Sequence, residues 1–149
     1  MLRRVAVSSI VIVLVGACTQ IVGPARTYRD YELKAGNSAK AVASSVATAL
    51  LGVEAARRHR ATGPYLSVLI ASAEEDASSV QSQFDSVQPP SAHADAQRAE
   101  LDDLLSQAVE GLALLRITVR RGELDQLDTK ARPLRAVLVR LRTLSEEWQ

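Results

Sequence analysis

The chain has 149 residues, with 18 Lys and Arg, 17 Asp and Glu, and a formal net charge of +1. This balance gives no support for a nucleic-acid-binding protein, whose surface is strongly basic. One cysteine cannot form a disulfide within the chain, and an aromatic content of 3% favours helices over strands.

The beginning of the chain has the layout of an export signal. Arg3 and Arg4 precede an apolar run from Val5 to Ala17, and small residues come directly before Cys18. The run is shorter than the roughly 20 apolar residues that a membrane-spanning helix needs. We therefore expect a cleaved signal peptide over residues 1–17.

The segment Val15-Gly16-Ala17-Cys18 resembles the lipobox of bacterial lipoprotein precursors, in which Leu, Val or Ile is followed by two small residues and Cys. The resemblance implies a diacylglycerol thioether on Cys18, cleavage in front of it and often acylation of the new amine. Two or three acyl chains, at about 0.8 kcal/mol per buried CH₂, would hold the protein on a membrane. The alternatives are a plain secretory peptide or an uncleaved signal anchor.

The lipidated Cys18 and a short tether are expected to occupy residues 18–26, before a helical domain over 27–149. Gly23-Pro24 lies in the tether, whose eight residues after the cysteine reach at most about 29 Å when fully extended. The folded domain should therefore sit close to the bilayer.

The first helix is expected from Thr27, which with Asp30 forms a helix N-terminal cap, to about Ala61. Gly36-Asn37 is a weak point where this helix bends or begins afresh. The stop at Thr62-Gly63-Pro64 combines a C-terminal glycine with a proline suited to the first turn of the next helix.

Three further segments repeat apolar residues at intervals of three and four, the pattern of a helix with one buried side. The second helix ends at Gln88-Pro89-Pro90-Ser91 and the third at Arg120-Arg121-Gly122. Pro133 is expected to kink the fourth near Thr129. The stripes comprise Leu66, Ile70, Ala73, Ala77, Val80, Phe84 and Val87, then Leu101, Leu105, Ala108, Leu112, Leu115 and Val119, and finally Leu124, Leu127, Ala131, Leu134, Leu138, Leu141 and Trp148.

Four amphipathic helices with short connections predict an all-α fold, an antiparallel up-down-up-down four-helix bundle. The alternative is a three-helix core with a loosely docked or broken first helix, because that segment is rich in Ala and Ser and its stripe is the least apolar. Gly52 is expected to permit a close helix approach. Tyr28 and Tyr31 are expected to pack near Trp148, or else to lie at the headgroup boundary.

The sequence contains no motif that names a reaction. Neither His59 nor His93 has an acid three residues before it, as the Glu-x-x-His pairs of di-metal bundles require. Haem, nucleophile-elbow and phosphate-loop motifs are also missing from the sequence. We expect no cofactor and no enzyme, with Glu74-Glu75-Asp76 and Asp102-Asp103 on solvent-facing sides.

Charge placement predicts a basic end of the bundle, distal to the membrane, and an acidic end near it. The distal residues are Arg57, Arg58, His59, Arg60, Arg120 and Arg121, and the acidic ones are Asp85, Asp95, Glu100, Asp102, Asp103, Glu146 and Glu147. Helix dipoles alone explain such an arrangement, at about 0.3–1 kcal/mol per charge. The functional alternative is that the five arginines contact an anionic cell-wall polymer or an acidic protein surface.

Over nearly its whole length the chain resembles small uncharacterised helical lipoproteins of actinobacteria. The lipobox, Thr62-Gly63-Pro64-Tyr65 and Gln88-Pro89-Pro90 carry the resemblance. It implies an anchor in the outer leaflet of the cytoplasmic membrane and brings no activity with it. We expect a non-enzymatic interaction or accessory module of the cell envelope. The alternatives are a bundle that binds a small apolar or metal-containing ligand between its helices, and an envelope hydrolase.

Overall fold

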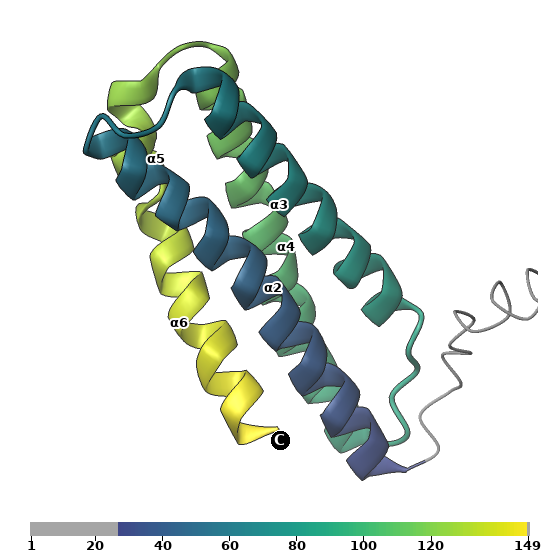
Figure 1. The fold of residues 1–149 in the computed structure, drawn as a ribbon. Helices are drawn as coiled ribbons and strands as arrows, with labels where there is room; N and C mark the ends of the chain where they lie inside the picture. Colours follow the sequence, from purple (N-terminus) through teal and green to yellow (C-terminus); the bar gives the residue numbers. More distant parts are fainter. Residues whose placement is uncertain (1–26, 149) are drawn as a thin grey trace, which may run out of the picture.

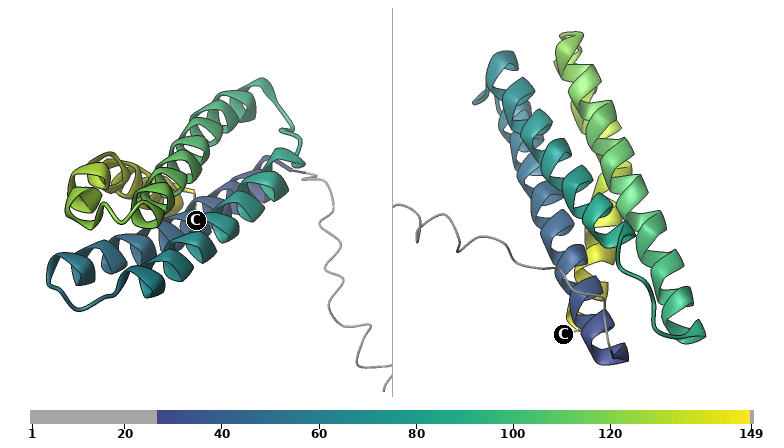
Figure 2. Two further views of the ribbon diagram at one scale, coloured as in Figure 1. Left: turned by 90° about the horizontal axis from the view of Figure 1, so that it is seen from above. Right: turned by 90° about the vertical axis from the view of Figure 1, so that its right-hand side faces the viewer.

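The computed structural model describes residues 27–148, which form an all-α bundle (Figure 1). Successive long helices run in opposite directions, and both ends of the described chain lie at the same end of the bundle (Figures 1 and 2). The elements are α2 (Tyr28–Arg57), α3 (Gly63–Asp85), α4 (Ala92–Arg120), the 3₁₀ turn η2 (Leu124–Gln126), α5 (Leu127–Lys130) and α6 (Arg132–Glu147). The predicted helical bundle is confirmed.

The helix starts follow the expected local signals. The Thr27 hydroxyl oxygen accepts a hydrogen bond from the Asp30 amide at 3.1 Å, as the sequence predicts for the start of α2. Ser91 caps α4 in the same way, and Pro64 lies in the first turn of α3.

The end of α2 differs from the expectation. The helix stops at Arg57 rather than near Ala61, and Gly63 opens α3 instead of closing α2. His59 takes the left-handed conformation at φ 54°, and its amide donates to the Ala56 carbonyl at 2.9 Å. This motif normally uses glycine, as α4 does at Gly122, with φ 73°.

α2 belongs fully to the core, so the alternative of a loosely docked first helix is wrong. Its buried side chains include Tyr31, Ala39, Val42 and Val46, each with no exposed surface. α2 is also the one helix of residues 27–148 that is long and apolar enough to cross a membrane by length and composition. Here its apolar side packs inside the bundle, as the core helix of a folded domain does.

Glycines allow α2 and α4 to approach their neighbours closely. A Cβ at Gly52 would lie 2.6 Å from Leu69 Cδ2, which confirms the expected close approach to α3. The helix does not break at Gly36-Asn37. Gly36 instead lies under Trp148, with its Cβ position 3.0 Å from the Trp148 carbonyl oxygen.

The predicted fourth helix is divided rather than kinked. α5 ends at Lys130, Ala131 forms a turn, and α6 begins with Pro133 in its first turn. Proline has no amide hydrogen to donate and its ring crowds the carbonyl of Thr129, so the helix restarts there. Most residues of the three predicted stripes are buried, with Val80, Leu124 and Leu138 partly exposed.

Candidate interaction surfaces

The α2–α3 turn and the end of α4 lie at the same end of the bundle (Figure 1). This end therefore carries the predicted basic residues. All of them are exposed: Arg57, Arg58, His59, Arg60, Arg120 and Arg121.

Two of these arginines are held by one carboxylate. Arg57 donates to both oxygens of Glu54 at 2.9 and 2.8 Å, and Arg58 donates to Glu54 Oε1 at 2.6 Å. These hydrogen bonds, from Arg57 first and Arg58 second, lower the pKa of Glu54 to about 2. Charge placement at the end of α2 did not predict these ion pairs, although Glu54 lies one helical turn before the two arginines. Arg60, Arg120 and Arg121 are the arginines of this end that hold no ion pair within residues 27–148.

A cleft of about 480 Å³ opens at the same end, where α2 meets η2 and α5. Apolar side chains of both parts line it, and its polar groups are Arg57, His59, Asp125 and Asp128. Asp128 is already paired with Arg135 at 2.6 Å. The cleft combines apolar surface with a few polar groups, which is the general character of a small-molecule site.

The opposite end contains the predicted acids, and Arg98 pairs with one of them, Asp102. Its guanidinium donates to the Val87 carbonyl at 2.7 Å, the Asp85 carbonyl at 2.9 Å and Asp102 Oδ2 at 3.3 Å. Burial raises the pKa of Asp102, while the charge of Arg98 opposes the rise. Asp102 is therefore part of the α3–α4 junction and not a plain solvent-facing acid.

The rings of the two tyrosines contact aromatic side chains of α3 and α4, and Tyr31 belongs to the same buried core as Trp148. Tyr31 is buried with its ring centroid 6.1 Å from that of Phe84, and burial raises its pKa to about 12. The Tyr28 ring lies 5.4 Å from the ring of His93. His93 is exposed and takes part in packing at the start of α4.

Glu74 also differs from its expected solvent-facing role. It forms a two-point ion pair with Arg116, in which Arg116 Nη2 lies 3.1 Å from Glu74 Oε1. The pair joins α3 to α4 and is partly buried. No local sequence signal reveals it, because the two residues are 42 positions apart.

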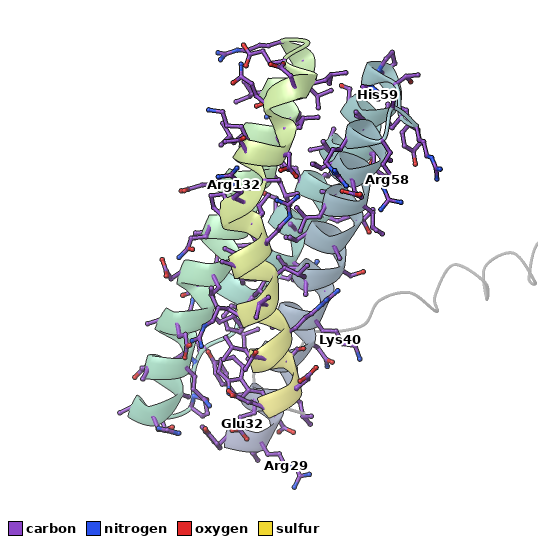
Figure 3. The ribbon with its side chains drawn as sticks, turned by 90° about the vertical axis from the view of Figure 1, so that its left-hand side faces the viewer. Arg29, Glu32, Lys40, Arg58, His59 and Arg132 are labelled. Carbon is purple, nitrogen blue, oxygen red and sulfur yellow. The ribbon has the colours of Figure 1, made fainter. Side chains whose placement is uncertain are left out.

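The structure reveals a charge difference between the two sides of the bundle. α2 and α6 pack together and carry eight Lys and Arg against five Asp and Glu. α3 and α4 pack together and carry three Arg against nine Asp and Glu. Figure 3 shows the α2 and α6 side, with Arg29, Lys40, Arg58 and Arg132 along it. The predicted difference in charge between the two ends of the bundle is thus accompanied by a difference in charge between its two sides.

Within residues 27–148, no three or more His, Cys, Asp or Glu side chains gather as metal ligands would. The signal peptide over 1–17, Cys18 and the tether lie outside the described residues. Comparisons of the chain with protein-family models, with characterised proteins and with solved structures find no match. The resemblance to actinobacterial lipoproteins therefore stays a prediction.

Proposed function

We propose that the protein is a lipid-anchored, non-enzymatic interaction or accessory module on the extracytoplasmic face of the cell membrane. The observation that carries the proposal is Val15-Gly16-Ala17-Cys18 after the Arg3-Arg4 and apolar run. A folded bundle that begins at Thr27, nine residues after Cys18, supports it, because an anchored module needs a short link to a stable domain.

Mass spectrometry of the protein from its own host tests the anchor. We expect the mature chain to begin at Cys18 and to carry added diacylglycerol, and we expect Cys18→Ser to be unmodified and uncleaved. Thr19→Ser is the matched control and should be processed like the wild type. An unmodified Cys18 in the native protein would contradict the proposal.

The partner that we propose for the basic end, the end of the bundle opposite the start of α2, is anionic, an envelope protein or a cell-wall polymer. Exposed Arg60, Arg120 and Arg121 support this, since they hold no ion pair within the described part of the chain. Changing these three residues to Gln should reduce retention on isolated envelope polymer and make it less sensitive to salt. Unchanged retention would argue against this partner.

A second candidate function is binding of a small ligand in the cleft between α2 and α5. Its volume of about 480 Å³ is within the range of ligand pockets, and Val53, Ala56 and Leu127 supply apolar surface. The probe 1-anilinonaphthalene-8-sulfonate should fluoresce in this cleft, and Ala61→Trp should abolish that signal by filling it. Ala96→Trp, on the exposed surface of α4, is the control.

A further inference from the structure

The exposed side of α2 carries cations and apolar side chains in one stripe. Arg29, Lys40 and Leu51 follow one another at intervals of eleven residues, which is about three helical turns. Arg58, just beyond the helix, extends the same line, eighteen residues and about five turns after Lys40. All four side chains are exposed, and Leu51 is 71% exposed.

The neighbouring helix α6 continues this surface. Arg132 and Val139 are seven residues apart, so they project on the same side of α6, and Val139 is 62% exposed. Between the two helices runs a shallow groove of about 440 Å³, with Lys40 on its α2 wall and Arg142 on its α6 wall. We call this surface the α2/α6 face and define it by Arg29, Lys40, Leu51, Arg132, Val139 and Arg142. Figure 3 labels Arg29, Lys40 and Arg132.

The cations of the α2/α6 face are available to a partner. Arg29, Lys40, Arg132 and Arg142 form no ion pair within residues 27–148. The other acids of α2 and α6 lie toward one end, at Asp30, Glu32, Glu146 and Glu147, and Glu146 also lines the groove beside Lys40 and Arg142. Glu54 is already neutralised by two arginines. Over most of its length the α2/α6 face is therefore cationic.

The exposed apolar side chains of α3 lack this cationic setting. Val68 on α3 is 69% exposed and Tyr65 is 58% exposed, but α3 contains four acids and no Lys or Arg. Apolar side chains among cations distinguish a surface that binds anionic lipid from one that does not. The α2/α6 face has both exposed apolar side chains and cations, whereas α3 has exposed apolar side chains only.

We propose that the α2/α6 face lies on the surface of an anionic phospholipid bilayer, with the helices parallel to the membrane plane and α3 and α4 turned away. The placement rests on the proposed anchor, because the tether from Cys18 joins the start of α2. α2 is about 45 Å long, and the cations of the α2/α6 face run from Arg29 and Lys40 in its first half to Arg132 at the start of the antiparallel α6, so a flat surface can contact them together. Leu51 and Val139 enter the interfacial region, while Lys40 and Arg142 hold lipid phosphates at the groove.

Vesicle flotation of the full chain with Cys18→Ser tests this face without the anchor. The probe is vesicles of phosphatidylcholine with 30% phosphatidylglycerol, compared with vesicles of phosphatidylcholine alone. Adding Lys40→Gln and Arg142→Gln should lower the partition coefficient on anionic vesicles about 30-fold, at about 1 kcal/mol per cation. The matched control is Arg120→Gln with Arg121→Gln, which removes the same charge and should change binding less than about three-fold.

A second matched pair of variants tests how much the exposed apolar side chains contribute to vesicle binding. Val139→Gln should weaken binding to the anionic vesicles about three-fold, whereas Val68→Gln, at an equally exposed valine of α3, should not. Because every variant keeps the same N-terminal segment, binding by that segment cancels in each comparison. Equal binding by the two members of each pair, or equal binding to neutral vesicles, would overturn the proposal.

The experiments distinguish a wrong proposal for the α2/α6 face from a wrong proposal for the lipid anchor on Cys18. Loss of lipid on Cys18 in the host would leave the vesicle result unchanged, whereas a lipidated Cys18 with equal flotation of all variants would remove only the α2/α6 proposal. Binding to soluble polyglutamate in preference to vesicles would also overturn it, in favour of an acidic protein or polymer.

Discussion

The two sides of the bundle use their charged residues in different ways. Between α3 and α4, polar side chains cross the interface: Arg116 pairs with Glu74, and Gln81 Nε2 donates to Ser106 Oγ at 2.9 Å. Between α2 and α6, contact is made largely by packing, with Trp148 on Gly36. Arg98 and Arg116 of α4 thus serve the fold. Arg29 of α2 and Arg132 and Arg142 of α6, by contrast, are exposed and hold no ion pair within residues 27–148.

This difference indicates where to look for binding. A cation that already holds a carboxylate across two helices has little free energy to give to a partner, because the existing pair must first be broken. Lys40 and Arg142 have no such pair within the described residues, so substitution there should affect binding more than stability.

The largest expected effect on stability comes from the α2–α6 packing. Gly36→Leu should destabilise the fold by about 1–3 kcal/mol, because its side chain would meet the backbone of Trp148, which cannot rotate away. Urea unfolding followed by circular dichroism measures this. Gly63→Ala is the control, since nothing lies within 4 Å of its Cβ position. Equal stability of the two variants would show that α2 and α6 are less tightly packed than described.

α2 and α4 are both followed by a residue with positive φ, which is His59 after α2 and Gly122 after α4. The two ends therefore compare the same helix-ending motif with two residue types. His59→Gly should stabilise the fold by about 1 kcal/mol, because glycine adopts positive φ without the steric cost of a side chain. Gly122→Ala should destabilise it by a similar amount. Thermal unfolding measures both, and a His59→Gly variant no more stable than the wild type would contradict the assigned conformation.

The ion pair between α3 and α4 should contribute about 1 kcal/mol, since both side chains are only partly exposed. Glu74→Gln should lose this contribution in urea unfolding, and Glu75→Gln, at the exposed neighbour, should not. A double-mutant cycle with Arg116→Gln isolates the pair. Additive effects of the two substitutions would mean that the pair stabilises nothing.

The smallest expected effect on stability is the pH-dependent contribution of the Glu54 carboxylate. Its pKa is lowered from 4.5 to about 2, so its charged form stabilises the folded state above pH 4.5, and this contribution is lost as pH falls through 2. Glu54→Gln should have a slightly lower melting temperature than the wild type at pH 7 and the same one below pH 2. A difference that persists at low pH would show that Glu54 acts through packing and not through Arg57 and Arg58.

Most of the helical pattern could be predicted because it is local. The Thr27 cap, the proline after Gly63 and the apolar stripe of α4 each depend on residues within a few turns of one another. The end of α2 could not, because the expectation relied on glycine, whereas His59 supplies the left-handed residue. The fourth helix was predicted as one kinked element because Pro133 lies beside an otherwise continuous stripe.

The sequence by itself determined the fold class, the approximate places where the long helices are connected and the pattern of the leader, because hydrophobic spacing and proline and glycine positions act on neighbouring residues. The tertiary structure decided which charges are neutralised. Glu74 and Arg116 meet across 42 residues, and Lys40 and Arg142 face one groove from two helices. Such pairings arise only when helices pack side by side, so a charge count along the chain cannot separate a cation that holds the fold together from one that is free to bind.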